Sequence, residues 1–200
     1  MNQNHIKRLE NIFKSDGLIV RTTALRANNF CSKDITKLIA EGYLSKLRTG
    51  YFIKTSAMSE LSEIELVSLM FPEGIISMFS ATQIHHMSTV NPTAISITIP
   101  RKMRMPLLPE YPPIRVYKVI QKMYEVGIVE NVMPNTKIKV YDRERTVCDF
   151  FRMRNKLGED IALEVLKSYM SGPKNIQKLY EYAKILQIKS VIKPYVEALL

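Results

Sequence analysis

The stretch CSKDITKLIAEGYLSKLRTGYFIK (residues 31–54) runs from the pattern of a short amphipathic helix directly into that of a β-hairpin. In its first half, Ile35, Leu38 and Ile39 recur at helical spacing and predict one apolar stripe. Gly42 supplies a typical C-terminal stop, because glycine adopts the left-handed backbone conformation without strain. The stretch therefore predicts a helix with one buried face, followed at once by extended chain.

The second half of the stretch has the alternation of a two-stranded ribbon. Residues 43–47 read Tyr-Leu-Ser-Lys-Leu, residues 51–53 return as a second strand, and Arg48, Thr49 and Gly50 form the expected turn. An arginine on a projecting ribbon can enter a narrow minor groove of DNA, where the negative potential is enhanced. We therefore expect Arg48 to project from the tip of this ribbon.

Two further helices are predicted upstream of this stretch. Residues 5–15 carry apolar side chains at helical spacing and stop at Gly17, and Thr22 or Thr23 caps a second short helix that ends at an Asn-Asn pair. Three helices followed by a ribbon are the order of a winged helix-turn-helix. The sequence therefore predicts such a DNA-binding domain over residues 1–56.

The charge distribution points to the same segment. The chain has 200 residues and a formal net charge of +10, and residues 1–56 hold ten Lys and Arg against four acidic residues. An excess of this sign favours a polyanionic partner such as DNA, RNA or an acidic membrane face. The plain alternative is a basic protein whose charge only keeps it in solution.

The third predicted helix, which Ser32 is expected to cap, carries the candidate reading face. Lys33 and Lys37 point away from its apolar stripe and Thr36 lies on one shoulder, so these side chains are predicted to approach base edges. Flanking cations are predicted to hold phosphates or the minor groove. The basic run at residues 101–104 either extends this surface or is a solvated loop. The full set of predicted residues for binding double-stranded DNA is Arg21, Arg26, Ser32, Lys33, Thr36, Lys37, Lys46, Arg48, Thr49, Arg101, Lys102 and Arg104.

Residues 57–200 predict a larger second domain of mixed structure. Isoleucines alternate with polar residues and a proline over 95–100, which indicates a half-buried strand, and further strand patterns lie at 114–119, 138–141 and, less regularly, 128–132. Ser62 with Glu65 and Ser80 with Gln83 match the capping box, so helices are expected to begin near residues 59–62 and at Ser80. The pattern after residue 142 is helical. Together with the first domain, this gives an α+β protein.

No residue pattern indicates an enzyme, a metal or a cofactor. His85 and His86 are neighbours on a predicted helix, so their side chains diverge by about 100° and cannot ligate one metal as a pair. Cys31 and Cys148 belong to no Cys-x-x-Cys pattern and are expected to be reduced, half-buried packing residues. Glycine-rich phosphate loops and hydrolase motifs are absent from the sequence.

Several short motifs follow one another in a characteristic order between residues 6 and 170. They are Ser32-Lys33-Asp34, residues 38–44 and 47–52, Ser80-Ala81 with His86, Asn91-Pro92, residues 95–101, and Glu144-Arg145-Thr146-Val147-Cys148-Asp149. In this order they resemble the AbiEi family, the antitoxins and transcriptional regulators of type IV toxin-antitoxin systems. The resemblance implies a DNA-binding repressor and antitoxin that autoregulates its operon. It further implies that the second domain counters a nucleotidyltransferase toxin without forming a stable complex with it.

Other interpretations of the same residues remain. The winged domain can instead be a protein-interaction module that docks an acidic partner or the toxin itself, or Tyr43, Tyr51 and Phe52 can serve as stacking platforms for RNA. If the partner is DNA, the second domain is expected to orient more than one copy on it. The longest apolar region, residues 67–79, is interrupted by Pro72-Glu73-Gly74, so the sequence predicts a cytoplasmic protein without a membrane span.

Overall fold

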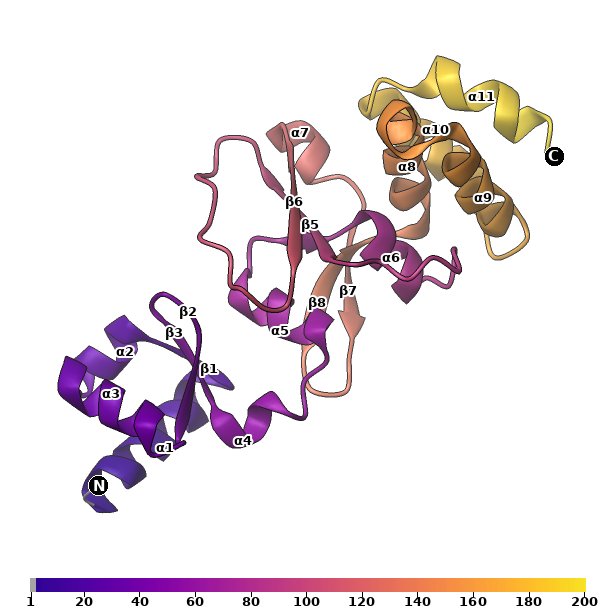
Figure 1. Cartoon of the computed structure of the whole chain (residues 1–200). Helices are drawn as coiled ribbons and strands as arrows, with labels where there is room; N and C mark the ends of the chain where they lie inside the picture. Colours follow the sequence, from indigo (N-terminus) through magenta and orange to yellow (C-terminus); the bar gives the residue numbers. More distant parts are fainter. Residues whose placement is uncertain (1–2) are drawn as a thin grey trace.

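The computed structural model describes residues 3–200 and divides along the chain into three parts (Figure 1). The amino-terminal unit, residues 3–54, has its own small sheet, the central unit, residues 55–141, contains a larger sheet, and the helices after residue 142 pack together at the far end. Helices and two separate sheets confirm the predicted α+β class. The predicted boundary between residues 56 and 57 falls inside a short helix, α4 (Thr55–Met58).

The amino-terminal unit contains the three predicted helices and the predicted hairpin, together with one short strand that the sequence did not indicate. Its elements are α1 (Gln3–Asp16), β1 (Ile19–Arg21), α2 (Thr22–Ala27), α3 (Ser32–Ala40), β2 (Leu44–Arg48) and β3 (Tyr51–Lys54). The sheet order is β1-β3-β2, and both pairings are antiparallel. The unpredicted β1 is three residues long and follows α1 after a Gly17 turn.

The two faces of this small sheet have different neighbours. On one face, Val20 and Phe52 pair across the strands and pack with apolar side chains of α1, α2 and α3. On the other face, Leu47 and Ile53 belong to a core cluster that includes Val67 of the central unit. The sheet is therefore enclosed between its own helices and the second unit, and this packing fixes which face of the amino-terminal unit remains free.

The central unit is built on a sheet with strand order β6-β5-β4-β8-β7. Its elements are α5 (Glu63–Met70), β4 (Ile75–Ile76), α6 (Met78–Ile84), β5 (Ile95–Pro100), β6 (Ile114–Val119), α7 (Gln121–Tyr124), β7 (Ile128–Val132) and β8 (Lys137–Tyr141). All four predicted strands are present, and the unpredicted β4 joins the antiparallel β5 to the parallel β8. The chain from 101 to 113 connects the parallel strands β5 and β6 over the surface.

One of the two predicted capping boxes is correct. Ser62 precedes α5, its backbone N–H donates to the Glu65 carboxylate at 2.9 Å, and Glu65 returns a backbone N–H to the Ser62 hydroxyl at 3.4 Å. The prediction that a helix begins at Ser80 is wrong, because α6 begins at Met78 and Ser80 lies inside it. The buried Ser80 hydroxyl instead accepts the backbone N–H of Ser96 at 2.9 Å, which ties α6 to β5.

The carboxyl-terminal part is a helical bundle made of α8 (Arg143–Leu157), α9 (Glu159–Met170), α10 (Ile176–Ile185) and α11 (Lys189–Glu197). Its side chains share a core with α6, in which Phe79 and Phe150 make an edge-to-face contact at 5.0 Å between ring centroids. Arg145 is buried at the start of α8 and forms an ion pair with Asp149 at 3.1 Å. In the described part of the chain, no helix combines the length and the apolar character needed to cross a membrane.

The histidines and cysteines differ in part from expectation. Helix α6 ends at Ile84, so neither histidine lies in a helix; His85 is half-buried against the Tyr141 carbonyl at 2.7 Å, and His86 is exposed. Burial lowers the pKa of His85 because it disfavours the charged ring. The expectation of two half-buried cysteines is wrong, because Cys31 is exposed and Cys148 is fully buried.

Candidate nucleic-acid interface

Helix α3 begins one residue earlier than the sequence suggested. Cys31, not Ser32, occupies the N-cap position, and its backbone N–H donates to the Asp34 carboxylate at 2.8 Å. Hydrogen bonds from the Cys31 side chain and backbone lower the pKa of Asp34. Ser32 therefore lies in the first turn, with its side chain exposed.

The outer face of α3 is polar and accessible. Lys33, Thr36 and Lys37 are exposed, as the helical periodicity predicted. The Thr36 hydroxyl donates to the Ser32 carbonyl at 3.0 Å, and Lys37 pairs with Glu41 at 3.8 Å across one helical turn. The helix lies on the side of the amino-terminal unit away from the central sheet (Figure 1). A long polyanion therefore has access to this face without displacing another element.

Two more cations accompany α3. Arg26 on α2 and Lys46 on β2 are exposed, and β2 packs against α3. Lys46 is paired across the hairpin with Phe52, whose side chain faces the helices, so Lys46 lies on the helical side of the sheet. We call Arg26, Ser32, Lys33, Thr36, Lys37 and Lys46 the α3 face. Ile39 is 36% exposed, so the buried stripe of the helix is narrower than predicted.

The prediction that Arg48 projects from the hairpin is wrong. Its guanidinium lies 3.6 Å from the ring centroid of Tyr51 and 4.8 Å from that of Phe71, and Nη2 donates to the Met70 carbonyl at 2.9 Å. Met70 is the last residue of α5, where carbonyls lack helical partners and the helix dipole attracts a cation. Burial lowers the pKa of Arg48, but an arginine remains protonated in this range. Arg48 thus joins the two units and is not offered to a minor groove.

Replacing Arg48 with Met is expected to lower the free energy of unfolding by about 1–3 kcal/mol, because a charge-assisted hydrogen bond and two aromatic contacts are lost. Lys46→Met is the matched control on the same strand. Lys46 is exposed and, within residues 3–200, makes no such contacts, so its replacement is expected to cost less than about 0.5 kcal/mol. Urea unfolding measures both changes. Equal costs would contradict the structural role of Arg48.

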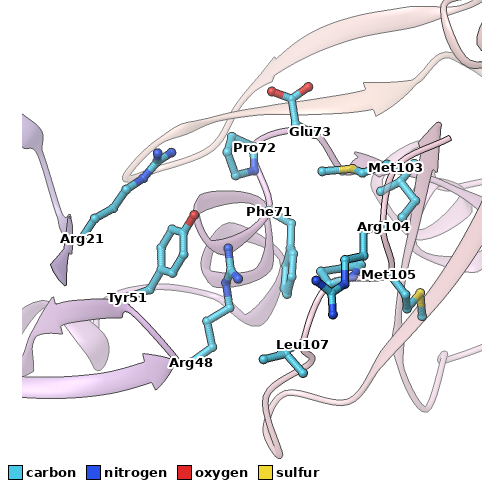
Figure 2. A pocket seen from close by; sticks show the side chains of 13 residues that line it. Arg21, Arg48, Tyr51, Phe71, Pro72, Glu73, Met103, Arg104, Met105 and Leu107 are labelled. Carbon is cyan, nitrogen blue, oxygen red and sulfur yellow. The ribbon is translucent and has the colours of Figure 1, made fainter. Parts of the chain in front are cut away.

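The other predicted residues divide between two places. Arg21 and Arg104 line a cleft between the amino-terminal and central units, together with Arg48, Tyr51 and Phe71 (Figure 2). Arg101 and Lys102 are exposed where the chain leaves β5, and Thr49 is exposed in the hairpin turn. The structure therefore separates the predicted set into the α3 face, the cleft arginines, and a few exposed residues that belong to neither.

Sequence reasoning missed the cleft altogether. The aromatic residues 51 and 71 and the methionines 103 and 105 that line it are far apart in the sequence. The available signal was the basic and apolar run from Arg101 to Leu108, because exposed large apolar side chains in a connecting loop often mark a binding site. Within residues 3–200, no group of three or more His, Cys, Asp or Glu side chains is placed to hold a metal ion.

The fold and the exposed face define a class: an α+β protein whose amino-terminal unit presents a basic helix away from a larger sheet-and-helix body. Among solved structures, the chain is similar to the Rv2827c protein of Mycobacterium tuberculosis, with a TM-score of 0.53 and 12% sequence identity. The alignment covers 100% of this chain and 82% of that one. At this identity, the likeness shows the fold alone. No family model and no curated protein matches the sequence.

Proposed function

We propose that this chain is a sequence-specific DNA-binding protein that acts as a transcriptional repressor, with residues 3–54 as a winged helix-turn-helix. The observation that carries the proposal is the α3 face: an exposed helix with Lys33, Thr36 and Lys37 in its first turns, on the free side of the unit. A recognition helix contacts bases with the residues of its N-terminal half, and lysine and threonine both hydrogen-bond to base edges.

The remaining residues of the α3 face have a positioning role in this proposal. Arg26 and Lys46 flank the helix from α2 and β2 and would bind phosphates on either side of the groove. The hairpin differs from a minor-groove wing in one respect, because the Arg48 side chain contacts Met70 and Phe71 of the second unit and does not project. Base selection therefore rests on α3, and affinity rests on the cations around it.

The biological role as an antitoxin depends on the AbiEi resemblance. As that resemblance implies, the protein represses its own operon and counters a nucleotidyltransferase toxin without forming a stable complex with it. The central sheet and the helical bundle would carry this activity and orient copies of the protein on DNA. Co-expression tests this part separately: the chain is expected to relieve growth arrest by a nucleotidyltransferase encoded beside it, and the Lys37→Ala variant, whose second unit is intact, is expected to relieve it equally.

DNA binding is tested by the dependence of affinity on salt, with duplexes taken from the region upstream of the coding frame. The α3 face holds Arg26, Lys33, Lys37 and Lys46; if each meets a phosphate, log affinity falls with log salt at a slope of about −4. If Arg101 and Lys102 reach the same duplex, the slope becomes about −5. A weak interaction that does not depend on salt would exclude DNA as the partner.

The alternative function is a module that docks an acidic protein through the same basic face. It would give a stoichiometric protein partner on purification and no retardation of upstream DNA. Any DNA binding at low salt would then come from charge alone and would show no preference among duplex sequences.

A further inference from the structure

A cleft is lined by residues of the amino-terminal sheet and of the central unit (Figure 2). Its volume is about 540 Å³. Arg48 and Tyr51 lie on one side, opposite the loop that follows β5, and Arg21 lies beyond Tyr51 (Figure 2). Met105 and Leu107 of that loop form the opposite wall and are 49% and 69% exposed. Cavities of 300–1,000 Å³ at the junction of two units are typical sites for small molecules.

The cleft combines three guanidinium groups with an apolar lining. Within residues 3–200, neither Arg21 nor Arg104 has an ion-pair partner, and Nε of Arg48 is buried without a hydrogen-bond acceptor. Among the described residues, Glu73 is the single carboxylate of the lining, and its side chain is turned away from Arg48 and Arg104 (Figure 2). The cleft therefore has an excess of positive charge in apolar surroundings, where an anion is held more strongly than in water.

We propose that this cleft binds a small organic anion, a carboxylate, sulfonate or phosphate carried on an apolar or aromatic body. Arg104 holds the anionic group, and Phe71, Met105 and Leu107 cover the apolar body. An inorganic anion would leave these apolar side chains facing water, and a nucleic-acid duplex is too wide for a cavity of about 540 Å³. This site goes beyond the proposed function, since it involves none of the α3-face residues.

A tryptophan reporter tests the site, because the chain has no tryptophan of its own. Leu107→Trp places an indole on the cleft wall, and Leu200→Trp, at a side chain that is 75% exposed, places one on the chain end as a control. The probe is 8-anilinonaphthalene-1-sulfonate. We expect saturable quenching of the Leu107→Trp emission with a Kd on the order of 10 µM. The Leu200→Trp emission should stay unchanged over that range.

The charge requirement is tested with Arg104→Gln against Arg101→Gln. Both arginines are exposed on the same loop, but only Arg104 lines the cleft. Arg104→Gln is expected to weaken probe binding about tenfold, as is removal of the sulfonate from the probe, while Arg101→Gln has no effect. Laurate should displace the probe, whereas inorganic phosphate at the same concentration should not.

Thermal unfolding separates binding to the folded protein from binding to an unfolded chain. A ligand of the native cleft raises the midpoint of unfolding, and an unfolded-state ligand lowers it. Equal quenching at positions 107 and 200, an Arg104→Gln variant that binds like the parent, displacement by phosphate as strong as by laurate, or a lowered midpoint would each overturn the proposal.

Discussion

Replacing Arg145 with Met is expected to lower the free energy of unfolding by about 3–5 kcal/mol. Arg145 is fully buried, donates to the carbonyls of Met123 and Val126, and pairs with Asp149. Methionine fills a similar volume but donates nothing. Two carbonyls and a carboxylate that is 2% exposed would then be left in the interior with fewer partners.

The matched control is Arg152→Met on the same helix. Arg152 also contacts Asp149, at 3.3 Å, but its side chain is 25% exposed and the Arg145 pair remains after its removal. Its loss is expected to cost about 1 kcal/mol or less. Urea unfolding monitored by circular dichroism compares the two variants. Similar losses for both would show that the buried network around Arg145 contributes little, and that the junction of α8 with the central sheet is held by apolar packing alone.

Replacing Lys33 or Lys37 with Ala is expected to weaken binding to the preferred DNA sequence by about 1–3 kcal/mol each, which is roughly 5- to 150-fold. Binding to unrelated duplexes should weaken much less, because a base contact is lost only where the base is correct. Folding should be nearly unaffected. The Lys37 side chain is 59% exposed, and its pair with Glu41 is an exposed contact across one turn.

Lys193→Ala provides a control with the same local chemistry. Lys193 pairs with Glu197 across one turn of α11, at 3.5 Å and with similar exposure, but lies in the helical bundle at the other end of the molecule. It is expected to bind DNA like the parent protein. If Lys33→Ala and Lys37→Ala reduce affinity equally for every duplex, α3 contributes only charge and the base-reading role is wrong.

Local signals in the sequence predicted most of the amino-terminal unit. These signals are the helical spacing of apolar residues, the alternating pattern of the hairpin, and the helix stops at Gly17 and Gly42. Each involves only a few neighbouring residues, so it can be recognised from the sequence alone. The strands β1 and β4 were not predicted, because they have only three and two residues, too few to show an alternating pattern. Their pairing is decided by neighbouring strands that are distant in the sequence.

The candidate site could be predicted only where exposure depends on one helix. The positions of Lys33, Thr36 and Lys37 follow from helical geometry, and the structure leaves them exposed. The position of the Arg48 side chain could not be predicted in this way, because its contacts come from the end of α5. That helix end lies more than twenty residues further along the chain and supplies both a hydrogen-bond acceptor and an aromatic ring. Likewise, Ser80 lies inside α6 because that helix begins at Met78, directly after the short strand β4, which pairs with the distant β5.

The central claim is that α3, and not the hairpin tip, meets the bases. Amide chemical-shift mapping of the ¹⁵N-labelled protein with its preferred duplex tests it most directly. We predict that the largest shifts fall on residues 32–37, with smaller shifts near Arg26 and Lys46 and almost none in α9 to α11. Shifts centred on the hairpin turn or the central sheet, with residues 32–37 unchanged, would contradict the account.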